Sequence, residues 1–187
     1  CEKASGGGMI LDWGVHLIDQ MLKLIPEKIV TVNCNTTHIT NKEVDDGFRL
    51  ELGFASGKSA YVEVGTYNFI PMPRFYMQCE SGSLYLEDWK KKPSISKLTR
   101  WIEKDVTPVQ NAAGITKTMA PRDELTLKTY EVERPVSDVH DFYRNYVAAV
   151  NGECEQLIKN CEVRRVLLVM QAAFKSTETM TALKVNI

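Results

Sequence analysis

The sequence lacks most of the short motifs from which a chemistry can be read directly. It contains no G-x-G-x-x-G and no G-x-x-x-x-G-K-[ST] pattern, so the usual glycine loops for dinucleotides and triphosphates are absent. It has no G-x-S-x-G pattern, no cysteines at C-x-x-C spacing and only three histidines. Neither a serine nucleophile nor a cysteine- or histidine-rich metal site is therefore predicted.

Broader features are missing as well. The 23 basic and 24 acidic residues give a net charge of -1, which favours neither nucleic acid nor an anionic membrane as a partner. No apolar run approaches the roughly 20 residues that span a bilayer, and no secretory signal pattern occurs. The five cysteines are odd in number, as is typical of reduced thiols. The sequence therefore predicts a cytoplasmic protein with neither nucleic-acid nor membrane partners.

The composition that is present, 44% hydrophobic and 25% charged, is typical of one globular domain over residues 1–187. Residues 48–54 and 60–64 alternate apolar and polar side chains around a Ser-Gly turn, which predicts an antiparallel hairpin with one buried face. Further strands are predicted at 28–39, 74–79, 83–87, 125–132 and 184–187, and helices at 139–151 and from 160 or 161 onward. This order predicts an α+β fold, with a largely antiparallel open β-sheet and helices packed on one face. Residues 88–125 lack periodicity and are predicted to be a loop-rich excursion.

The most informative stretch begins with three glycines, Gly6–Gly8, which permit positive φ and close approach of the backbone to its neighbours. The apolar run Met9–Ile25 that follows predicts a helix, which Pro26 ends. At about 100° per residue, four ionisable side chains share an arc of roughly 60°: Asp12, His16, Asp19 and Lys23. Since the rest of the helix surface is almost wholly apolar, we expect a buried helix whose ionisable side chains are paired or line a cavity.

Asp12 and His16 are the candidate catalytic pair. Side chains at i and i+4 of a helix are neighbours, so the carboxylate can orient the imidazole or raise its basicity. A histidine with a pKa near the reference of about 6.5 is suited to proton transfer at neutral pH. One alternative is a core histidine whose hydrogen bond the aspartate satisfies. A shared metal ion is another, but His38 and His140 do not have ligand-like spacing, and no metal is predicted.

The chain begins Cys1-Glu2-Lys3, without a methionine, a few residues before this stretch. We therefore expect the sequence to be a piece of a longer protein whose active site lies near the start of this piece.

The glycine triplet followed by Asp12-x-Gly14-x-His16-x-x-Asp19 resembles the motif that opens the second domain of the Gfo/Idh/MocA oxidoreductases, the family of glucose-fructose oxidoreductase and inositol dehydrogenase. The resemblance continues across most of the chain, except for residues 88–125. Further stretches that occur in the family's order are 44–46, 81–84, 141–152 and 162–176.

The resemblance implies the C-terminal substrate-binding and oligomerisation domain of an NAD- or NADP-dependent dehydrogenase of sugars or polyols. It implies that His16 accepts or donates the hydroxyl proton, that Asp12 holds both the substrate and the histidine, and that Asp19 contacts the substrate. The family's lysine lies in an EKP motif of the nucleotide-binding Rossmann domain, and Lys3 does not match it because Glu2-Lys3-Ala4 lacks the proline. We therefore expect the Rossmann domain, which binds most of the cofactor, to be absent from this sequence and the isolated chain to be inactive.

Tyr67 and Arg74 are predicted to bind substrate, because they lie on the connection between two hairpins and carry donors suited to hydroxyl groups. The sheet face that no helix is left to cover predicts a homo-oligomer. Two alternatives stay open: an NAD-dependent, redox-neutral glycosidase of the same family, and a non-catalytic dimerisation or scaffold domain. The ionisable side chains on the first helix favour the enzymes over the scaffold. Neither the identity of the sugar or polyol nor the choice between NAD and NADP is predicted.

Overall fold

The computed structural model describes residues 2–99, 109–116 and 126–187. The chain divides into two compact units, residues 1–69 with 139–187 and residues 70–138. The single domain expected over residues 1–187 stays a prediction.

The first unit is built on a four-stranded antiparallel sheet in the order β10-β1-β2-β3. Its strands are β1 (Ile29–Thr37), β2 (Gly47–Phe54), β3 (Ser59–Gly65) and β10 (Leu183–Lys184). Across three of them, Val32, Leu52 and Ala60 lie opposite one another and are buried. Because side chains alternate between the two faces of a strand, one face of this sheet is apolar and the other is polar. The predicted strands and the first hairpin are confirmed.

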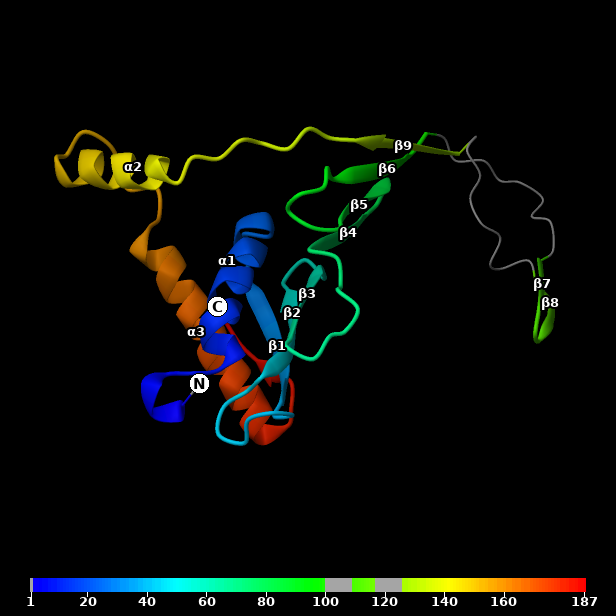
Figure 1. Cartoon of the computed structure of the whole chain (residues 1–187), viewed down its shortest axis with the longest axis horizontal. Coiled ribbons are helices and arrows are strands. Elements are labelled where there is room, and N and C mark those ends of the chain that lie inside the picture. The colour runs from blue at the N-terminus through cyan, green and yellow to red at the C-terminus, as the bar shows by residue number, and fades with distance from the viewer. Residues whose placement is uncertain (1, 100–108, 117–125) are drawn as a thin grey trace. The chain divides into compact units, whose positions relative to one another are not determined.

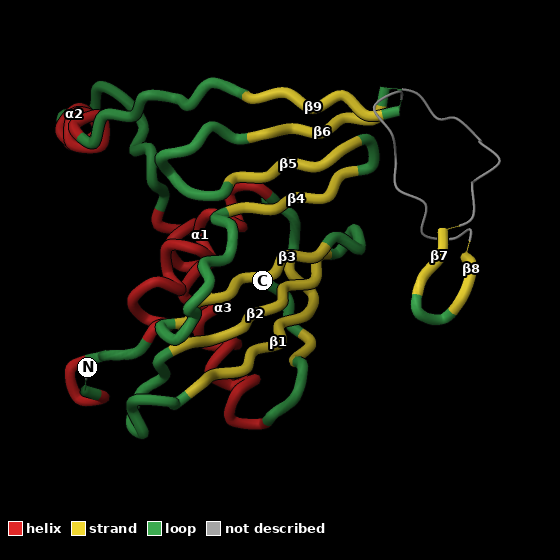
Figure 2. The backbone as a smooth tube through the Cα atoms, turned by 45° about the vertical axis from the view of Figure 1, so that its right-hand side comes forward, coloured by secondary structure: helices red, strands yellow, loops and turns green. Residues whose placement is uncertain are grey.

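The helices of this unit are the short 3-10 turn η1 (Lys3–Ser5), the π-helical turn η2 (Ile10–Gly14), α1 (Val15–Leu24), α2 (His140–Val150) and α3 (Asn160–Thr179). Figures 1 and 2 show α1 and α3 on the same side of the sheet. Their buried residues, among them Ile18, Leu22, Val169 and Ala173, form one core with the apolar sheet face. The first helix was expected to be buried on all sides, but it is buried on one side only.

The side of the first helix away from the core is exposed, with Leu11 at 41%, Trp13 at 47% and Leu24 at 48% exposure. A two-layer fold buries only the helix side that faces the sheet and the neighbouring helix. The expectation of complete burial was therefore wrong, because a high apolar content does not show how many layers surround a helix.

Ser176 ties α3 to the edge of the sheet. Strand β10 pairs with β1 only at Thr31 and Val32, so the next backbone groups of β1 need another partner. The buried Ser176 Oγ accepts a hydrogen bond from Cys34 N at 2.9 Å and donates one to Thr181 O at 2.7 Å. The hydroxyl of this serine thus replaces a missing strand partner.

Replacing Ser176 with alanine is expected to destabilise the fold by about 1–3 kcal/mol, because Cys34 N would stay buried without an acceptor. Urea unfolding of the full-length protein measures the loss. Gln171→Ala, at an exposed position of the same helix, is the control and should change stability little. Equal stability of the two variants would contradict this role of Ser176.

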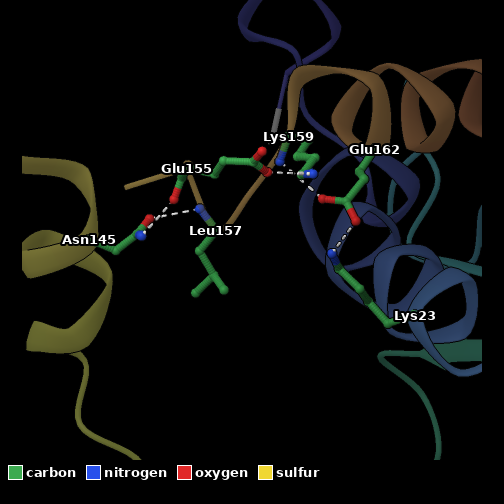
Figure 3. A network of polar contacts seen from close by, with 6 residues as sticks. All are labelled: Lys23, Asn145, Glu155, Leu157, Lys159 and Glu162. Atoms are coloured by element: carbon green, nitrogen blue, oxygen red, sulfur yellow. Dashed lines mark hydrogen bonds and ion pairs between the residues drawn. The ribbon is translucent and has the colours of Figure 1, made fainter. Parts of the chain in front are cut away.

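A polar network joins the beginning of α3 to α1 and to the segment after α2 (Figure 3). Glu162 accepts hydrogen bonds from Lys159 N at 3.0 Å and from Lys23 Nζ at 2.7 Å. Asn145 on α2 donates to Glu155 O and accepts from Leu157 N. The hydrogen bond from Lys23 lowers the pKa of Glu162, so this carboxylate stays ionised as it caps α3.

The second unit contains an antiparallel sheet in the order β4-β5-β6-β9. Its strands are β4 (Phe75–Cys79), β5 (Gly82–Leu86), β6 (Ser94–Leu98) and β9 (Leu127–Glu131), and a separate hairpin consists of β7 (Val109–Asn111) and β8 (Gly114–Thr116). The predicted second hairpin and the strand near 125–132 are confirmed. The expected excursion at 88–125 is partly regular, because β6 lies between β5 and β9. Residues 100–108 and 117–125 of that segment lie outside the described residues.

The α+β prediction is confirmed, and the antiparallel strands of the described residues are divided between two four-stranded sheets and one hairpin. Within the described part of the chain, no helix combines the length and the apolar character that crossing a membrane requires.

Candidate functional site

The site begins at the glycine turn. Gly6 and Gly8 adopt φ values of 70° and 118°, which side-chain-bearing residues rarely adopt. A Cβ atom on Gly8 would clash with Asp45 Oδ1. Positive φ and close approach, both expected of the triplet, therefore occur together at Gly8.

Asp45 caps the helix that follows the turn. Ile10 N donates to Asp45 Oδ2 at 2.8 Å, and Met9 N donates to Asp45 O at 3.1 Å. The residue is only 6% exposed. Its carboxylate satisfies a backbone N–H that has no partner within the helix, and it lies near the positive end of the helix dipole. The start of this helix is thus occupied by the chain's own carboxylate.

The D-x-G-x-H motif lies across a π-helical turn rather than within a regular α-helix. The turn η2 ends at Gly14, and α1 begins at Val15. A π-turn is wider than an α-helical turn, so each residue rotates by less than the expected 100° or so. A Cβ atom on Gly14 would lie 3.3 Å from Phe48 Cζ on β2, which explains the glycine at this position.

Asp12 and His16 are both exposed, Asp12 on the π-turn and His16 on α1. Within the described part of the chain, neither side chain makes a hydrogen bond or an ion pair. The expectation that they are paired or line a cavity is therefore not met, because this side of the helix is open. Their catalytic roles stay predictions.

The other two ionisable positions differ from this pair. Lys23 bonds to Glu162, which raises the pKa of the lysine above its ordinary value. Lys23 therefore serves the contact between α1 and α3. Asp19 is half-buried on α1 and contributes to the raised pKa of Lys23 through its charge.

Tyr67 lines a hollow at one end of the first sheet. The residues around this hollow include Asp46 and Tyr67 together with Thr37, Arg49, Glu63, Thr66 and Asn68. Asp46 accepts hydrogen bonds from Thr40 N and from the hydroxyl groups of Thr37 and Thr40. These donors, above all the backbone N–H of Thr40, lower the pKa of Asp46 to about 2.

The pKa of Asp46 predicts a pH dependence of stability. Its ordinary pKa is 3.8 and its folded-state pKa is about 2, so ionised Asp46 stabilises the fold above about pH 4. This contribution is lost as the pH falls from about 4 to about 2. Asp46→Asn should therefore be less stable than the wild type near neutral pH, and the difference should shrink over this range. Urea unfolding at several pH values measures it, and a difference that does not depend on pH would contradict the prediction.

Arg74 lies in the second compact unit, whereas Tyr67 lies in the first. Its guanidinium lies 5.2 Å from the centre of the Trp89 ring, and its backbone N donates to Glu87 O at 3.1 Å. A cation–π contact of this kind holds the side chain in place. The roles of Tyr67 and Arg74 in binding substrate stay predictions. Over the described residues, no group of three or more His, Cys, Asp or Glu side chains is arranged to hold a metal ion.

The comparisons with known proteins bear on this fold. Residues 1–85 match the family described as the GFO/IDH/MocA C-terminal domain. An NAD-binding protein from Listeria innocua is 38% identical in sequence, with a TM-score of 0.90 over 98% of this chain and 53% of that one. No curated protein matches the chain.

More distant solved structures share the fold. An oxidoreductase from Bacillus cereus is 14% identical, with a TM-score of 0.70 over 96% of this chain and 53% of that one. A UDP-N-acetylglucosamine 3-dehydrogenase from Acidithiobacillus ferrooxidans is 12% identical, with a TM-score of 0.66 over 88% and 47% of the two chains. The chain thus spans about half the length of these proteins.

Together these likenesses define the class of the protein. It has the α+β fold of an oxidoreductase C-terminal domain. Residues 1–85 carry the C-terminal domain of the Gfo/Idh/MocA family, as the resemblance of the motif indicated, and the α+β fold of the described chain matches that domain.

Sequence reasoning did not identify Asp45 and Phe48 as parts of the site. Asp45 was noted only within the family-like stretch 44–46, and Phe48 only as one apolar residue of an alternating strand. Each contacts the first helix from more than 30 residues away in the chain, and neither a motif nor a periodicity links the two segments.

Proposed function

We propose that this chain is the substrate-binding and oligomerisation part of an NAD(P)-dependent oxidoreductase that acts on the CH–OH group of a sugar or polyol. The observation that carries the proposal is an exposed pair of side chains, Asp12 on the π-turn and His16 on the following helix α1. The π-turn packs against the sheet through Gly14. The match of residues 1–85 to the Gfo/Idh/MocA C-terminal domain supports the reaction class.

In this proposal His16 accepts the hydroxyl proton as the alcohol is oxidised and returns it in the reverse direction. A bound nicotinamide supplies the acceptor for the hydride that leaves the same carbon. Asp12 orients the imidazole and holds a substrate hydroxyl. Asp19 and Tyr67 bind further hydroxyl groups of the substrate.

The glycine turn does not suit the phosphates of a dinucleotide. The N–H groups of Met9 and Ile10 already donate to Asp45, and the nearby carboxylate would repel a phosphate. We therefore propose that NAD or NADP is bound mainly by a part of the full-length protein that this chain does not include. The NAD-binding relative, of which the chain covers 53%, supports this division.

We also propose that the full-length protein is a homo-oligomer whose subunits meet through the open face of the first sheet. Helices α1 and α3 pack on the apolar face of this sheet, where the core lies. The polar face presents groups for hydrogen bonds between subunits, including the ion pair of Arg49 with Glu63 and the hydroxyl of Tyr61.

A screen of the full-length protein tests the reaction. Aldoses and polyols are offered with NAD or NADP, and formation of the reduced cofactor is followed by its absorbance. Reduction with one group of these substrates is the expected result. A protein that holds its cofactor tightly but never reduces it with a sugar would contradict the proposal in favour of redox-neutral chemistry. A protein that binds no cofactor would contradict it in favour of a scaffold.

A further inference from the structure

Asp45 is a buried carboxylate to which the proposed reaction gives no role. It lies just before β2, 33 residues from Asp12 along the chain. Its backbone carbonyl and its carboxylate accept the N–H groups of Met9 and Ile10, the residues at which the first helix begins. Asp12 follows Ile10 by only two residues.

The segment that carries Asp45 is anchored to the sheet. Asp46 N donates to Thr37 O on β1 at 3.0 Å, and Thr66 N donates to Asp46 O at 3.3 Å. Val44 N donates to Asn41 Oδ1 at 3.3 Å. Hydrogen bonds of the residues before and after Asp45 therefore hold it in place. Through its own hydrogen bonds, Asp45 can fix the start of the helix relative to the sheet.

The helix accepts this contact only because residue 8 is a glycine. A side chain there would occupy the space of Asp45 Oδ1, and the φ of 118° would be strained in any residue with a Cβ. At the end of the turn, Gly14 packs on Phe48. The π-turn is thus fixed at its start by hydrogen bonds and at its end by packing.

We propose that Asp45 is a positioning residue, which holds the π-turn so that Asp12 and His16 face the substrate in a fixed relative orientation. The inference rests on the proposed function, since it assigns the geometry of the same site. The atom that matters is Asp45 Oδ2, because it accepts the hydrogen bond from Ile10 N at the start of the helix. Misplacing a reacting group by about 1 Å can cost about 100-fold in rate.

Two substitutions of Asp45 in the full-length protein separate positioning from stability. Asp45→Ala removes the acceptor and should lower kcat about 10- to 100-fold, with a smaller change in KM. Asp45→Asn keeps an amide oxygen of similar size in the same place and should restore most of kcat. Ser176→Ala is the matched control, because it removes a hydrogen bond to Cys34 on β1 rather than one to the turn. It is expected to destabilise the fold and to leave kcat unchanged.

Amide hydrogen exchange gives a readout that does not depend on turnover. Asp45→Ala should speed exchange at residues 9–14 by at least about 10-fold relative to Ser176→Ala at equal global stability. Unchanged exchange in this segment would overturn the inference, whether or not the protein oxidises sugars. Faster exchange together with an unchanged kcat would overturn it as well. If the wild type shows no turnover but Asp45→Ala speeds exchange at residues 9–14, the proposed function is refuted. The same result confirms that Asp45 holds the turn.

Discussion

His16→Ala in the full-length protein is expected to lower turnover of a sugar or polyol by about 100- to 10,000-fold, the range that a positioned general base contributes. Stability should stay nearly the same, because the imidazole is exposed and makes no hydrogen bond or ion pair to the described residues. The combination of lost turnover and retained stability distinguishes a proton-transfer group from a structural histidine. Initial rates at saturating substrate and urea unfolding measure the two quantities.

His38→Ala is the matched control for this experiment. His38 is also exposed, near the end of β1, and its Nε2 lies 3.3 Å from Thr36 Oγ1. The same substitution at this position should leave turnover unchanged. Full turnover in His16→Ala would show that another group takes the hydroxyl proton. Equal losses at both positions would point to a general effect of removing an imidazole.

The period of the side-chain pattern made much of this fold predictable. Strands β2 and β3 follow the two-residue alternation of 48–54 and 60–64, which reflects one buried and one open sheet face. The long helix α3 follows its spaced apolar residues in the same way. Strand β6 was missed because Ser94–Leu98 is short, carries a lysine and lies in a proline-containing stretch. Its pairing with β5 and β9 outweighs the weak local pattern.

The candidate site was predictable only where it lies within one segment. The motif placed Asp12, Gly14 and His16 on a single helix, and the structure agrees. It did not reveal the π-turn, whose ends contact Phe48 and Asp45 from distant parts of the chain. The exposure of the helix also depends on how many layers pack around it, and the local sequence does not reveal the number of layers.

Phe48→Ala is expected to cause a large loss of stability, about 3–5 kcal/mol. Phe48 is 1% exposed, and its ring fills the space between β2 and Gly14. Truncation leaves a cavity that the rigid sheet and helix can close only in part. Urea unfolding of the full-length protein measures the loss. Phe69→Ala is the control: its ring is 90% exposed, so the same truncation should cost far less.

A double-mutant cycle then tests whether Phe48 is the reason for the glycine in the motif. Gly14→Ala places a methyl group 3.3 Å from Phe48 Cζ, a distance that the ring must relieve by moving. With Leu in place of Phe48 the ring atom is gone, so Gly14→Ala should destabilise the Phe48→Leu background less than it destabilises the wild type. Contacting residues commonly show such coupling, at about 0.5–3 kcal/mol. Additive losses would mean that Gly14 is required by the π-turn backbone itself, because the ring would then make no difference to the added methyl group.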